Sequence, residues 1–391
     1  MSYQQLRPTD KLLLGPGPAS VDPEILRAAS LGVLGYLDPE FIGIMDDTMD
    51  LLRQTFRTKN ELTIVVPGTG MAGMEAAVFN TVEPGDKIVI AVMGYFGERI
   101  VTMAERAGGV VTAVRFPWGQ AVDPEKLEAV VKQVRPAILA FVHAETSTGV
   151  LQPVAEISRI AKTYDCVLLA DAVTSLGGCK LEVDEWGIDV CYSGAQKCVG
   201  ALPGLAPLTM NARARAKLAK RATPPQSWYL DLTLIEKYWT GNPRAYHHTA
   251  PVNLVYTVYE AMRLAHAEGL ENRWTRHTQN ALALRAGLRA MGLQLFAADD
   301  IMLPPLTSIM IPAGIDDAKI RGQLLNEFGI EIGGGLGEGK GKIWRIGLMG
   351  YGSKRRHVML VLAALESLLR RAGHKCSPGA AVAAAEQIYQ A

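Results

Sequence analysis

The stretch CVLLADAVTSLGGCKLEVDEWGIDVCYSGAQK (residues 166–197) decides the fold that we expect for this chain. It begins with a fully apolar strand, 167–170, that ends at Asp171, and it closes with a second short apolar strand that runs into Lys197. Fully apolar strands are typical of a parallel sheet covered on both faces. Because such sheets place their sites at the carboxyl ends of the strands, we expect Asp171 and Lys197 at one edge. Taken singly, Asp171 reads better as a helix N-cap, and Lys197 as a surface residue.

The segments around this stretch repeat the alternation of strands and helices. Strands are expected at 62–66, 87–92, 110–116 and 137–142, and helices at 71–80, 96–107, 124–134, 153–164, 272–291 and 355–371. The alternation predicts an α/β fold, a large domain with a mostly parallel central sheet sandwiched by helices plus a smaller C-terminal α/β domain. We expect an N-terminal arm at 1–14, the large domain at 15–268 and the small domain at 269–391.

Composition favours a small-molecule partner. The chain has 391 residues, 49% apolar and 20% charged, with a formal net charge of +1 and no block of like charge. This balance argues against a nucleic-acid groove or a basic membrane face. No segment approaches the roughly 20 apolar residues that span a bilayer, so no membrane partner is expected.

Cysteine and histidine spacing predicts no metal site. The five cysteines form no C-x-x-C pair and no zinc-type cluster. His247 and His248 lack a third ligand at metal spacing, and His143 reads as a loop or core histidine. An odd cysteine count without a secretory leader indicates a reducing compartment, and we expect the cytoplasm.

The glycine-rich segment GTGMAG, residues 68–73, matches the dinucleotide fingerprint between a strand and a helix. A nicotinamide site also needs an acidic residue after the next strand, which here ends in Met93 and Gly94. Nicotinamide binding is therefore disfavoured. The helix-start amides at Thr69, Gly70 and Met71 can still hold a phosphate, although a purely structural turn accounts for the spacing equally well.

A second glycine-rich segment, GGLGEGKG at residues 334–341, nearly matches the P-loop. Gly341 occupies the position of the hydroxyl that should hold magnesium, and the next residues, KIWRIGL, read as a strand instead of a helix. A flexible hairpin loop is the better interpretation, and nucleotide triphosphate binding is rejected.

Taken together, the candidate residues suit an aldehyde cofactor. Such a cofactor needs an amine for a Schiff base, an anion opposite its ring nitrogen, a planar neighbour and a phosphate cradle. Lys197 and Asp171 offer the first two, Phe96 can stack on the ring, and the helix start at Gly70 can hold the phosphate. Arg345, within an apolar strand, has a planar fork that suits a substrate carboxylate.

With these residues in view, the chain resembles the alanine–glyoxylate/serine–pyruvate aminotransferases, within class V of the fold-type-I pyridoxal 5′-phosphate (PLP) enzymes. The resemblance runs through LLLGPGP (12–18), ETSTGVLQP (145–153), LLADAVTSLGG (168–178), YSGAQK (192–197), WYLDL (228–232), YHHT (246–249), GGLG (334–337) and IGLMG (346–350). The resemblance runs from residue 12 to residue 350, nearly the whole chain, and these stretches joined in this order are highly specific.

The resemblance implies a role for each matching residue. Lys197 is the Schiff-base lysine and Asp171 pairs with the pyridinium nitrogen. The remaining residues implied to bind the cofactor are Thr69, Gly70, Met71, Phe96, Thr146, Val173, Gln196, Tyr246 and Thr249. Those implied to bind substrate are Arg345, Gly17 and Thr146. Tyr246 and Thr249 are implied to reach the phosphate held by a partner subunit, hence a homodimer with its site at the interface.

Two positions depart from the family pattern. Phe96 stands where tryptophan is common, which preserves stacking, and Met71 stands where some members have histidine. A backbone N–H replaces part of that histidine's contact, so the second departure bears on the affinity for PLP.

The implied reaction moves an amino group from alanine or serine to glyoxylate or a similar 2-oxo acid by a ping-pong mechanism. Related transaminases that act on hydroxykynurenine, ureidoglycine or pyridoxamine share the same cofactor residues and stay open as alternatives. A cysteine desulfurase would need a mobile nucleophilic cysteine, whereas Cys376 lies in the tail and Cys198 reads as core. A protein that holds the cofactor without turnover is a further alternative, against which Lys197 and Arg345 argue.

Overall fold

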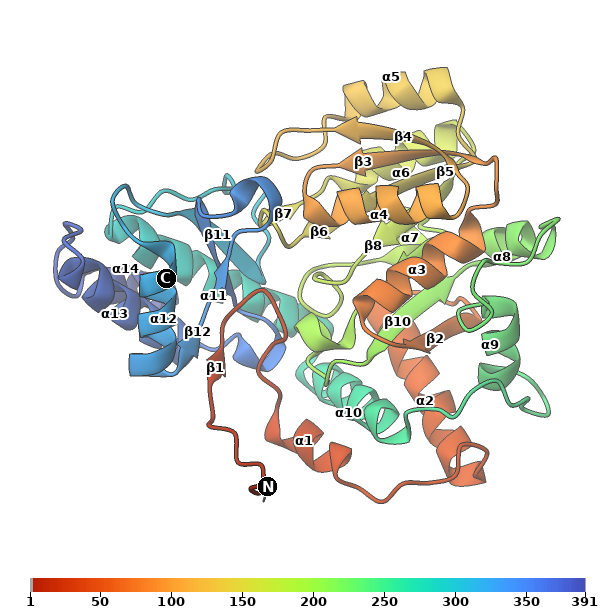
Figure 1. Cartoon of the computed structure of the whole chain (residues 1–391), viewed down its shortest axis with the longest axis horizontal. Helices are drawn as coiled ribbons and strands as arrows, with labels where there is room; N and C mark the ends of the chain where they lie inside the picture. The colour runs from red at the N-terminus through yellow and green to blue at the C-terminus, as the bar shows by residue number, and fades with distance from the viewer. Residues whose placement is uncertain (1–2, 391) are drawn as a thin grey trace.

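The computed structural model describes residues 3–390, and a seven-stranded sheet forms the centre of its larger part (Figure 1). The strand order is β2 (Leu62–Pro67), β10 (Leu205–Met210), β9 (Val190–Tyr192), β8 (Val167–Asp171), β5 (Ile138–Val142), β3 (Lys87–Val92) and β4 (Val110–Arg115). Neighbouring strands are parallel except in the two pairs that involve β10. The expected α/β fold with a mostly parallel sheet is confirmed.

Strand β10 has no counterpart among the strands expected from the sequence. Pro207 lies inside it, and a proline normally argues against a central strand because it has no N–H for the ladder. Here β10 runs antiparallel to both neighbours, and the carbonyl of Pro207 accepts the N–H of Ser193 at 2.7 Å. The chain thus passes through Lys197 and turns straight back along β9.

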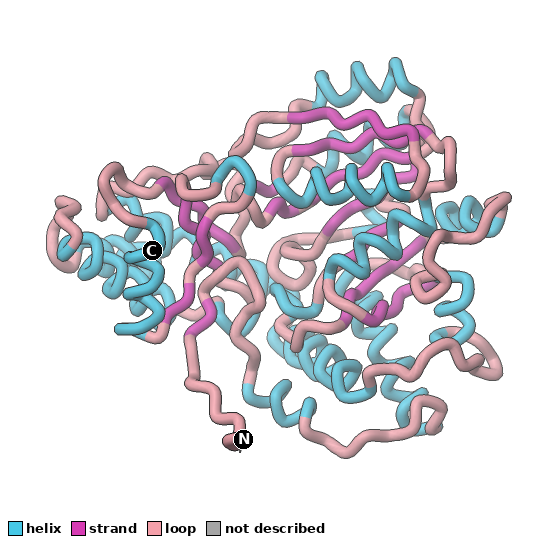
Figure 2. Tube along the Cα trace, viewed as in Figure 1, coloured by secondary structure: helices cyan, strands magenta, loops and turns pink. Residues whose placement is uncertain are grey.

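Helices cover both faces of this sheet (Figures 1 and 2). Helices α3 (Gly70–Thr81) and α4 (Tyr95–Arg106) lie side by side on one face, and α5 (Pro124–Val134) and α6 (Val154–Thr163) lie side by side on the other. Right-handed crossovers explain the division, because the chain crosses the sheet in one direction through the first pair and in the opposite direction through the second. These expected helices are confirmed, with ends shifted by at most one residue.

The rest of the larger part consists of short strands and peripheral helices. They are α1 (Pro23–Ala29), α2 (Pro39–Phe56), β6 (Ala144–Glu145), β7 (Val150–Leu151), α7 (Val183–Trp186), α8 (Ala212–Ala219), α9 (Leu232–Trp239) and α10 (Val252–Glu268). Helix α10 packs against α2 and contacts β10, so these two helices extend the cover over the β2 end of the sheet.

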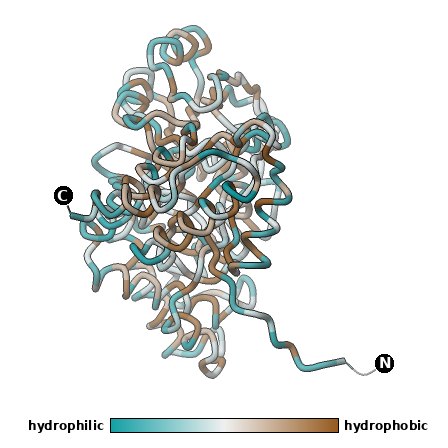
Figure 3. The backbone as a smooth tube through the Cα atoms, turned by 90° about the vertical axis from the view of Figure 1, so that its left-hand side faces the viewer, coloured by the Kyte–Doolittle hydropathy of each residue, from teal (hydrophilic) through white to brown (hydrophobic). Residues whose placement is uncertain are grey.

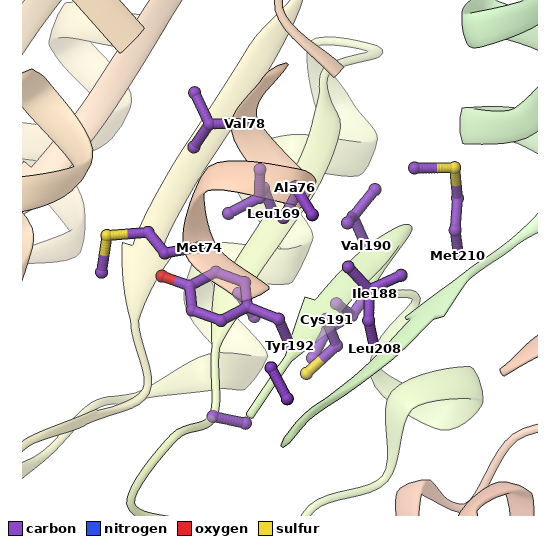
Figure 4. Packing of buried hydrophobic residues seen from close by; sticks show 14 of the residues in the cluster. Met74, Ala76, Val78, Leu169, Ile188, Val190, Cys191, Tyr192, Leu208 and Met210 are labelled. Atoms are coloured by element: carbon purple, nitrogen blue, oxygen red, sulfur yellow. The ribbon is translucent and has the colours of Figure 1, made fainter. Parts of the chain in front are cut away.

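Helix α3 approaches the sheet closely. Figure 4 shows Met74, Ala76 and Val78 of this helix within the same buried cluster as Leu169 of β8 and Tyr192 of β9. A Cβ atom at Gly73 would lie 2.8 Å from Cβ of Ala206 and 3.6 Å from Cβ of Tyr192, so only glycine permits this contact. The close approach sets the start of α3 beside the end of β9.

The C-terminal part has its own sheet and its own buried cluster. The sheet order is β11 (Leu306–Met310), β14 (Ile343–Gly347) and β13 (Gly333–Gly334), with helices α11 (Leu270–Ala290), α12 (Asp317–Phe328), α13 (Arg355–Arg371) and α14 (Ala380–Gln390). Helix α11 starts two residues before the expected helix, and α13 has the expected bounds. The second cluster is built mainly from residues of these helices and of β14. The expected domain borders, after residues 14 and 268, stay predictions.

The N-terminal segment connects to the C-terminal part. Strand β1 (Leu12–Leu13) pairs in parallel with β12 (Ile330–Glu331), and Leu14 is buried in the second cluster. Residues 3–10 are exposed and extend away from the body (Figure 3). The pairing brings the following residues, Gly15–Pro18, toward the large sheet.

The segment 334–341 forms the expected hairpin connection. Strand β13 pairs antiparallel with β14, and a single 3-10 turn, Gly337–Gly339, lies between them. A strand follows instead of a helix, so the rejection of a P-loop is confirmed. None of the helices within residues 3–390 has the length and apolar character needed to cross a bilayer.

Candidate active site

Asp171 and Lys197 leave the sheet at the same edge, as the sequence predicts. Asp171 is the last residue of β8 and pairs with Tyr192, the last residue of β9. Lys197 lies just beyond β9 in a π-helical turn, Ala195–Val199, which we name the Lys197 turn. Both side chains are buried and no helix begins at Asp171, so the readings as a helix cap and as a surface lysine are wrong.

The carboxylate of Asp171 accepts two hydrogen bonds. Its Oδ1 accepts the backbone N–H of Val173 at 2.8 Å, and its Oδ2 accepts the hydroxyl of Tyr192 at 2.7 Å. Burial raises the pKa of Asp171 to about 7, against the lowering effect of these two bonds and of Lys197. A cation beside the carboxylate would favour its charged form and lower this pKa. The site therefore suits a positively charged ring nitrogen.

The amine of Lys197 is buried against the N-terminal segment. The side chain is 9% exposed, and Nζ donates a hydrogen bond to the carbonyl of Pro16. A Cβ atom at Gly17 would lie 2.6 Å from Nζ, which shows how closely this segment approaches the amine, and the φ of +112° at Gly17 favours glycine there. Burial, followed by repulsion from Arg345, lowers the pKa of Lys197 to about 8. A fraction of this amine is therefore neutral near pH 7.

Four charged side chains are buried near this edge of the sheet and define what we call the interior of the site: Asp171, Lys197, Glu145 and Arg345. Asp171 and Glu145 raise the pKa of Lys197, while Arg345 lowers it. Lys197 in turn lowers the pKa of Asp171, and Glu145 raises it. Hydrogen bonds connect these positions, because Arg345 donates to the carbonyl of Thr146, which follows Glu145, and Thr146 bonds Thr174, three residues beyond Asp171. The amine and the carboxylate thus follow the ends of two neighbouring strands at one edge of the sheet.

The start of α3 lies beside this interior. A Cβ atom at Gly70 would lie 3.1 Å from Cγ2 of Val173 and 3.7 Å from Cα of Gly194, so three strand ends converge here. The first turn of a helix leaves backbone N–H groups without intrahelical partners, an arrangement that suits a phosphate. Thr69 and Met71 flank Gly70 and are exposed.

Gln196 contributes an unsatisfied amide to the same region. Its Oε1 atom is buried without a hydrogen-bond partner among the described residues. A buried polar atom without a partner is costly, and a half-turn of the amide presents its NH₂ group to an anion instead. This observation favours a bound group that the chain itself does not supply.

Arg345 and Thr146 connect the C-terminal part to the interior. Arg345, in β14, is buried and donates from Nε to the carbonyl of Gly334 at 2.8 Å and from Nη1 to the carbonyl of Thr146 at 3.2 Å. Within the described part of the chain, Nη2 makes no hydrogen bond, which leaves donors for a carboxylate. Burial lowers the pKa of Arg345 to about 10, where it is still a cation at neutral pH. The hydroxyl of Thr146 bonds that of Thr174.

Phe96 lies in the first turn of α4, where Glu145 fixes the backbone. Glu145 accepts the N–H of Phe96 at 3.2 Å and the N–H of Gly97 at 3.4 Å on Oε2, and Ser147 donates its hydroxyl to Oε1 at 2.6 Å. The ring of Phe96 is partly buried and meets Tyr95 edge-on. Glu145 and Tyr192 were not predicted as site residues, although both belong to stretches that carry the family resemblance.

Tyr246 and Thr249 lie on the surface of the chain and do not face the interior of its own site. Tyr246 is 58% exposed and packs against Tyr36 with a ring-centroid distance of 5.1 Å, and Thr249 is also exposed. Both precede α10, whereas the other predicted site residues lie just after strand ends, at helix starts, in β14 or, for Gly17, in the N-terminal segment. Their expected role in a partner's site stays a prediction.

Pyridoxal 5′-phosphate fits the residues that are present. An aldehyde suits Lys197, a ring nitrogen suits the buried Asp171, and a phosphate suits the start of α3 together with the unsatisfied Gln196. The fold and the site define a PLP-dependent enzyme of fold type I. The chain belongs to the aminotransferase class-V family, whose pattern matches residues 34–340. It is therefore an aminotransferase that uses PLP, and a protein without turnover is set aside.

Three relatives illustrate the similarity. An alanine–glyoxylate aminotransferase from Nostoc sp. has a solved structure with a TM-score of 0.93 and 47% identity, covering 95% of this chain and 98% of that one. The (S)-ureidoglycine–glyoxylate transaminase of Bacillus subtilis is 42% identical over 97% of this chain and 95% of its own length. The structure of a pyridoxamine–pyruvate aminotransferase from Mesorhizobium loti has a TM-score of 0.93 at 28% identity and covers 98% of both chains.

Proposed function

We propose that the chain transfers an amino group from a small amino acid, alanine or serine, to glyoxylate or a similar 2-oxo acid by a ping-pong mechanism. The observation that carries this proposal is the buried Arg345, which joins the carbonyl of Thr146 at the edge of the sheet where the buried Lys197 lies. Arg345 offers a single buried fork with free donors, which fits one carboxylate, the group that an amino acid and a 2-oxo acid share. Two of the relatives named above use glyoxylate, as their names state.

The proposed mechanism assigns a task to each charged side chain. PLP, when bound, supplies an aldehyde that reacts with amines and a ring that acts as an electron sink. Lys197 Nζ leaves the carbonyl of Pro16 and, in its neutral form, takes the proton from the α-carbon of the donor. Asp171, in its ionised form, holds the proton on the ring nitrogen. Arg345 orients the carboxylate of both substrates, so that the α-carbon faces Nζ.

Ureidoglycine is a second candidate donor, because the Bacillus subtilis relative covers almost the whole chain at 42% identity. Hydroxykynurenine and pyridoxamine stay as further alternatives. The decisive experiment is a single-turnover measurement of the PLP form with each donor, followed by glyoxylate or pyruvate. We expect alanine or serine to convert the visible absorbance fastest and glyoxylate to restore it. Faster conversion by ureidoglycine, hydroxykynurenine or pyridoxamine would replace the proposed donor.

A desulfurase function is disfavoured by the cysteines. Cys198 is fully buried, and burial raises its pKa to about 12, which makes its thiol unreactive. Cys376 lies between α13 and α14 at the edge of the second cluster, and its pKa is also raised. Neither thiol has the mobile, ionised character that sulfur transfer from a substrate requires.

We further propose a homodimer in which Tyr246 and Thr249 reach the phosphate of the partner's site. An aromatic surface supports it: Trp228 is 66% exposed and stacks on the buried His247 at 4.6 Å, and Tyr229 is 44% exposed. His247 Nε2 is buried without a partner within residues 3–390. Exposed aromatic residues around an unsatisfied buried atom are typical of a surface that another chain covers. Light scattering of the purified protein tests this, and a monomer at all concentrations would refute it.

A cytoplasmic location is our expectation for the same enzyme. The odd number of cysteines, five, motivates this expectation. Fractionation of cells that express the full chain tests this directly. Recovery in a membrane or secreted fraction would contradict it.

A further inference from the structure

Three residues at the start of α11, Arg273, Arg276 and His277, lie outside the interior. They contact both the segment that follows Lys197 and the segment that follows the strand of Arg345. We propose that they are positioning residues that hold the Lys197 turn in register with the strand that carries Arg345. This inference rests on the proposed roles of Lys197 and Arg345. The three residues follow i, i+3, i+4 spacing and therefore share one face of the helix. Below, they are called the α11 clamp.

Arg273 holds the large-domain side. Its Nε donates to the carbonyl of Gly177 at 2.9 Å, and its Nη2 donates to the carbonyl of Cys198 at 2.8 Å. Cys198 directly follows Lys197, and Gly177 lies in the loop that follows Asp171. One guanidinium thus links the backbones behind the amine and behind the carboxylate. Its planar fork fixes their separation in a way that a lysine could not.

Arg276 and His277 hold the other side, the turn Gly350–Gly352, named the Gly350 turn. Arg276 Nη1 donates to the carbonyl of Gly350 at 3.1 Å. The N–H of Gly350 donates to His277 Nε2 at 3.0 Å, so Nδ1 carries the proton and donates to the carbonyl of Arg273 at 2.7 Å. Burial lowers the pKa of His277 to about 3, so it stays neutral and keeps this pattern.

The two turns also touch each other directly. Gly350 has a φ of +53°, and a Cβ atom there would lie 3.3 Å from the carbonyl oxygen of Cys198 and 3.5 Å from Cα of Gly200. The Gly350 turn follows β14, which carries Arg345, after only two residues. A displacement of β14 is therefore transmitted to the Lys197 turn over a few backbone bonds.

Glu268 binds both arginines of the α11 clamp. Its carboxylate accepts Arg273 Nη1 at 2.9 Å and Arg276 Nη2 at 2.9 Å, so one anion serves both cations. Arg273 is buried, and a buried ion pair costs desolvation that its Coulomb energy often fails to offset. Such a pair is poorly explained as a stabilising device alone. Its bonds to the Lys197 turn and to the Gly350 turn give a reason for its position.

Hydrogen exchange of individual segments, read by mass spectrometry, tests the clamp on the apo and PLP-loaded full chain. The amides to follow are Gly200 and Ala201, which close the Lys197 turn, and Gly352 and Ser353, which close the Gly350 turn. The variants are Arg273→Lys and Arg276→Lys, which both keep the charge. We expect each of them to speed exchange about tenfold in both turns, since each removes a charge-assisted bond from a shared unit.

A matched control is Arg285→Lys. Arg285 is a second buried arginine of α11, but it donates to the carbonyl of Ala297 at 2.8 Å and to Asp299 at 3.0 Å, away from both turns. The control should lower the melting temperature without changing exchange in either turn. If Arg273→Lys and Arg276→Lys each loosen only their own turn, or behave like the control, the clamp is refuted.

The spectrum of the loaded enzyme gives an independent readout. Because the clamp sets the environment of Lys197, Arg273→Lys should shift the pH midpoint of the absorbance of lysine-bound PLP, and Arg285→Lys should not. Should Arg273→Lys fail to fold, Arg276→Lys provides the same two readouts from the opposite side. Failure of the wild-type chain to bind PLP would refute the proposed function, whereas the exchange measurement on apo protein would still decide the clamp.

Discussion

The hydroxyl of Tyr192 donates a hydrogen bond of 2.7 Å to Oδ2 of Asp171, and both side chains are buried. The two residues are direct neighbours across β8 and β9. Burial raises the pKa of Tyr192 well above its ordinary value, so the phenol stays protonated and remains a donor at any working pH. Tyr192 thus opposes the effect of burial on Asp171 and favours the charged carboxylate.

Removal of this donor should weaken PLP binding. In Tyr192→Phe, the pKa of Asp171 should rise further above about 7, and a smaller fraction of the carboxylate is ionised at pH 7. We expect about a tenfold larger Kd for PLP at pH 7, by fluorescence titration, and a smaller difference at pH 9. If the Kd of Tyr192→Phe equals that of the wild type at both pH values, Tyr192 has no part in the charge state of Asp171.

The stability of the apo protein should reveal the buried charge of Asp171. Because its pKa is raised to about 7, the folded chain binds this proton more tightly than the unfolded chain, and its contribution to stability falls as pH rises between about 4 and 7. Asp171→Asn removes the charge, so the variant should exceed apo wild type at pH 8 by up to about 4 kcal/mol and match it near pH 4. Urea unfolding at both pH values measures this. The same variant should bind PLP poorly, and a variant that is less stable at pH 8 would contradict the argument.

The rate of PLP binding should follow the neutral form of Lys197. With its pKa lowered to about 8, the association rate measured by stopped flow should rise with pH and level off above that value. Since Arg345 contributes to this lowering, Arg345→Ala should move the midpoint to higher pH, whereas Arg345→Lys retains the positive charge and should move it less. If the pH midpoint is unchanged in both variants, Arg345 has no influence on the pKa of Lys197.

Substrate affinity should depend on the fork of Arg345. Arg345→Ala removes the only group proposed to pair with the carboxylate, and the loss should be about 2–4 kcal/mol in apparent binding of donor and acceptor alike. Steady-state KM values for both substrates give the measurement. Arg345→Lys is the control that keeps a charge without the planar fork. Unchanged KM values in Arg345→Ala would require another carboxylate site.

Mixed dimers can test whether Tyr246 acts across the subunit interface. Lys197→Ala and Tyr246→Ala should each be inactive or strongly impaired alone. When the two variants are mixed, one site of each mixed dimer combines an intact Lys197 with an intact Tyr246 from the other subunit, so activity should return. If Tyr246 serves the site of its own chain, mixing should restore nothing.

The sequence predicted the frame of the site well. Alternating apolar strands and helices were sufficient to place Asp171 and Lys197 at one sheet edge, because strand and helix periodicity are local properties of the chain. The fingerprint at 68–73 likewise predicted a helix start suited to phosphate, which the structure sets beside Val173. Strand β10 was not predicted, because Pro207 contradicts the local pattern of a central strand.

The supporting residues escaped notice for a different reason. Glu145 and Arg273 look in sequence like ordinary charged residues of a loop and a helix, and nothing local reveals that each is buried among backbone groups from distant segments. The contact of Pro16 with Lys197 joins positions far apart in the chain. Such contacts depend on how the two parts pack, and periodicity carries no information about that.

By itself, the sequence determined the fold class, which residues follow the ends of the strands, and which functional groups are available for catalysis. Only the tertiary structure decided which of these groups share an interior and in what charge state. Burial raises the pKa of Asp171 to about 7 and lowers that of Lys197 to about 8, although neither shift is written in the residues themselves. The physical reason is that desolvation and Coulomb effects depend on the surroundings in space, which the chain acquires only when it folds.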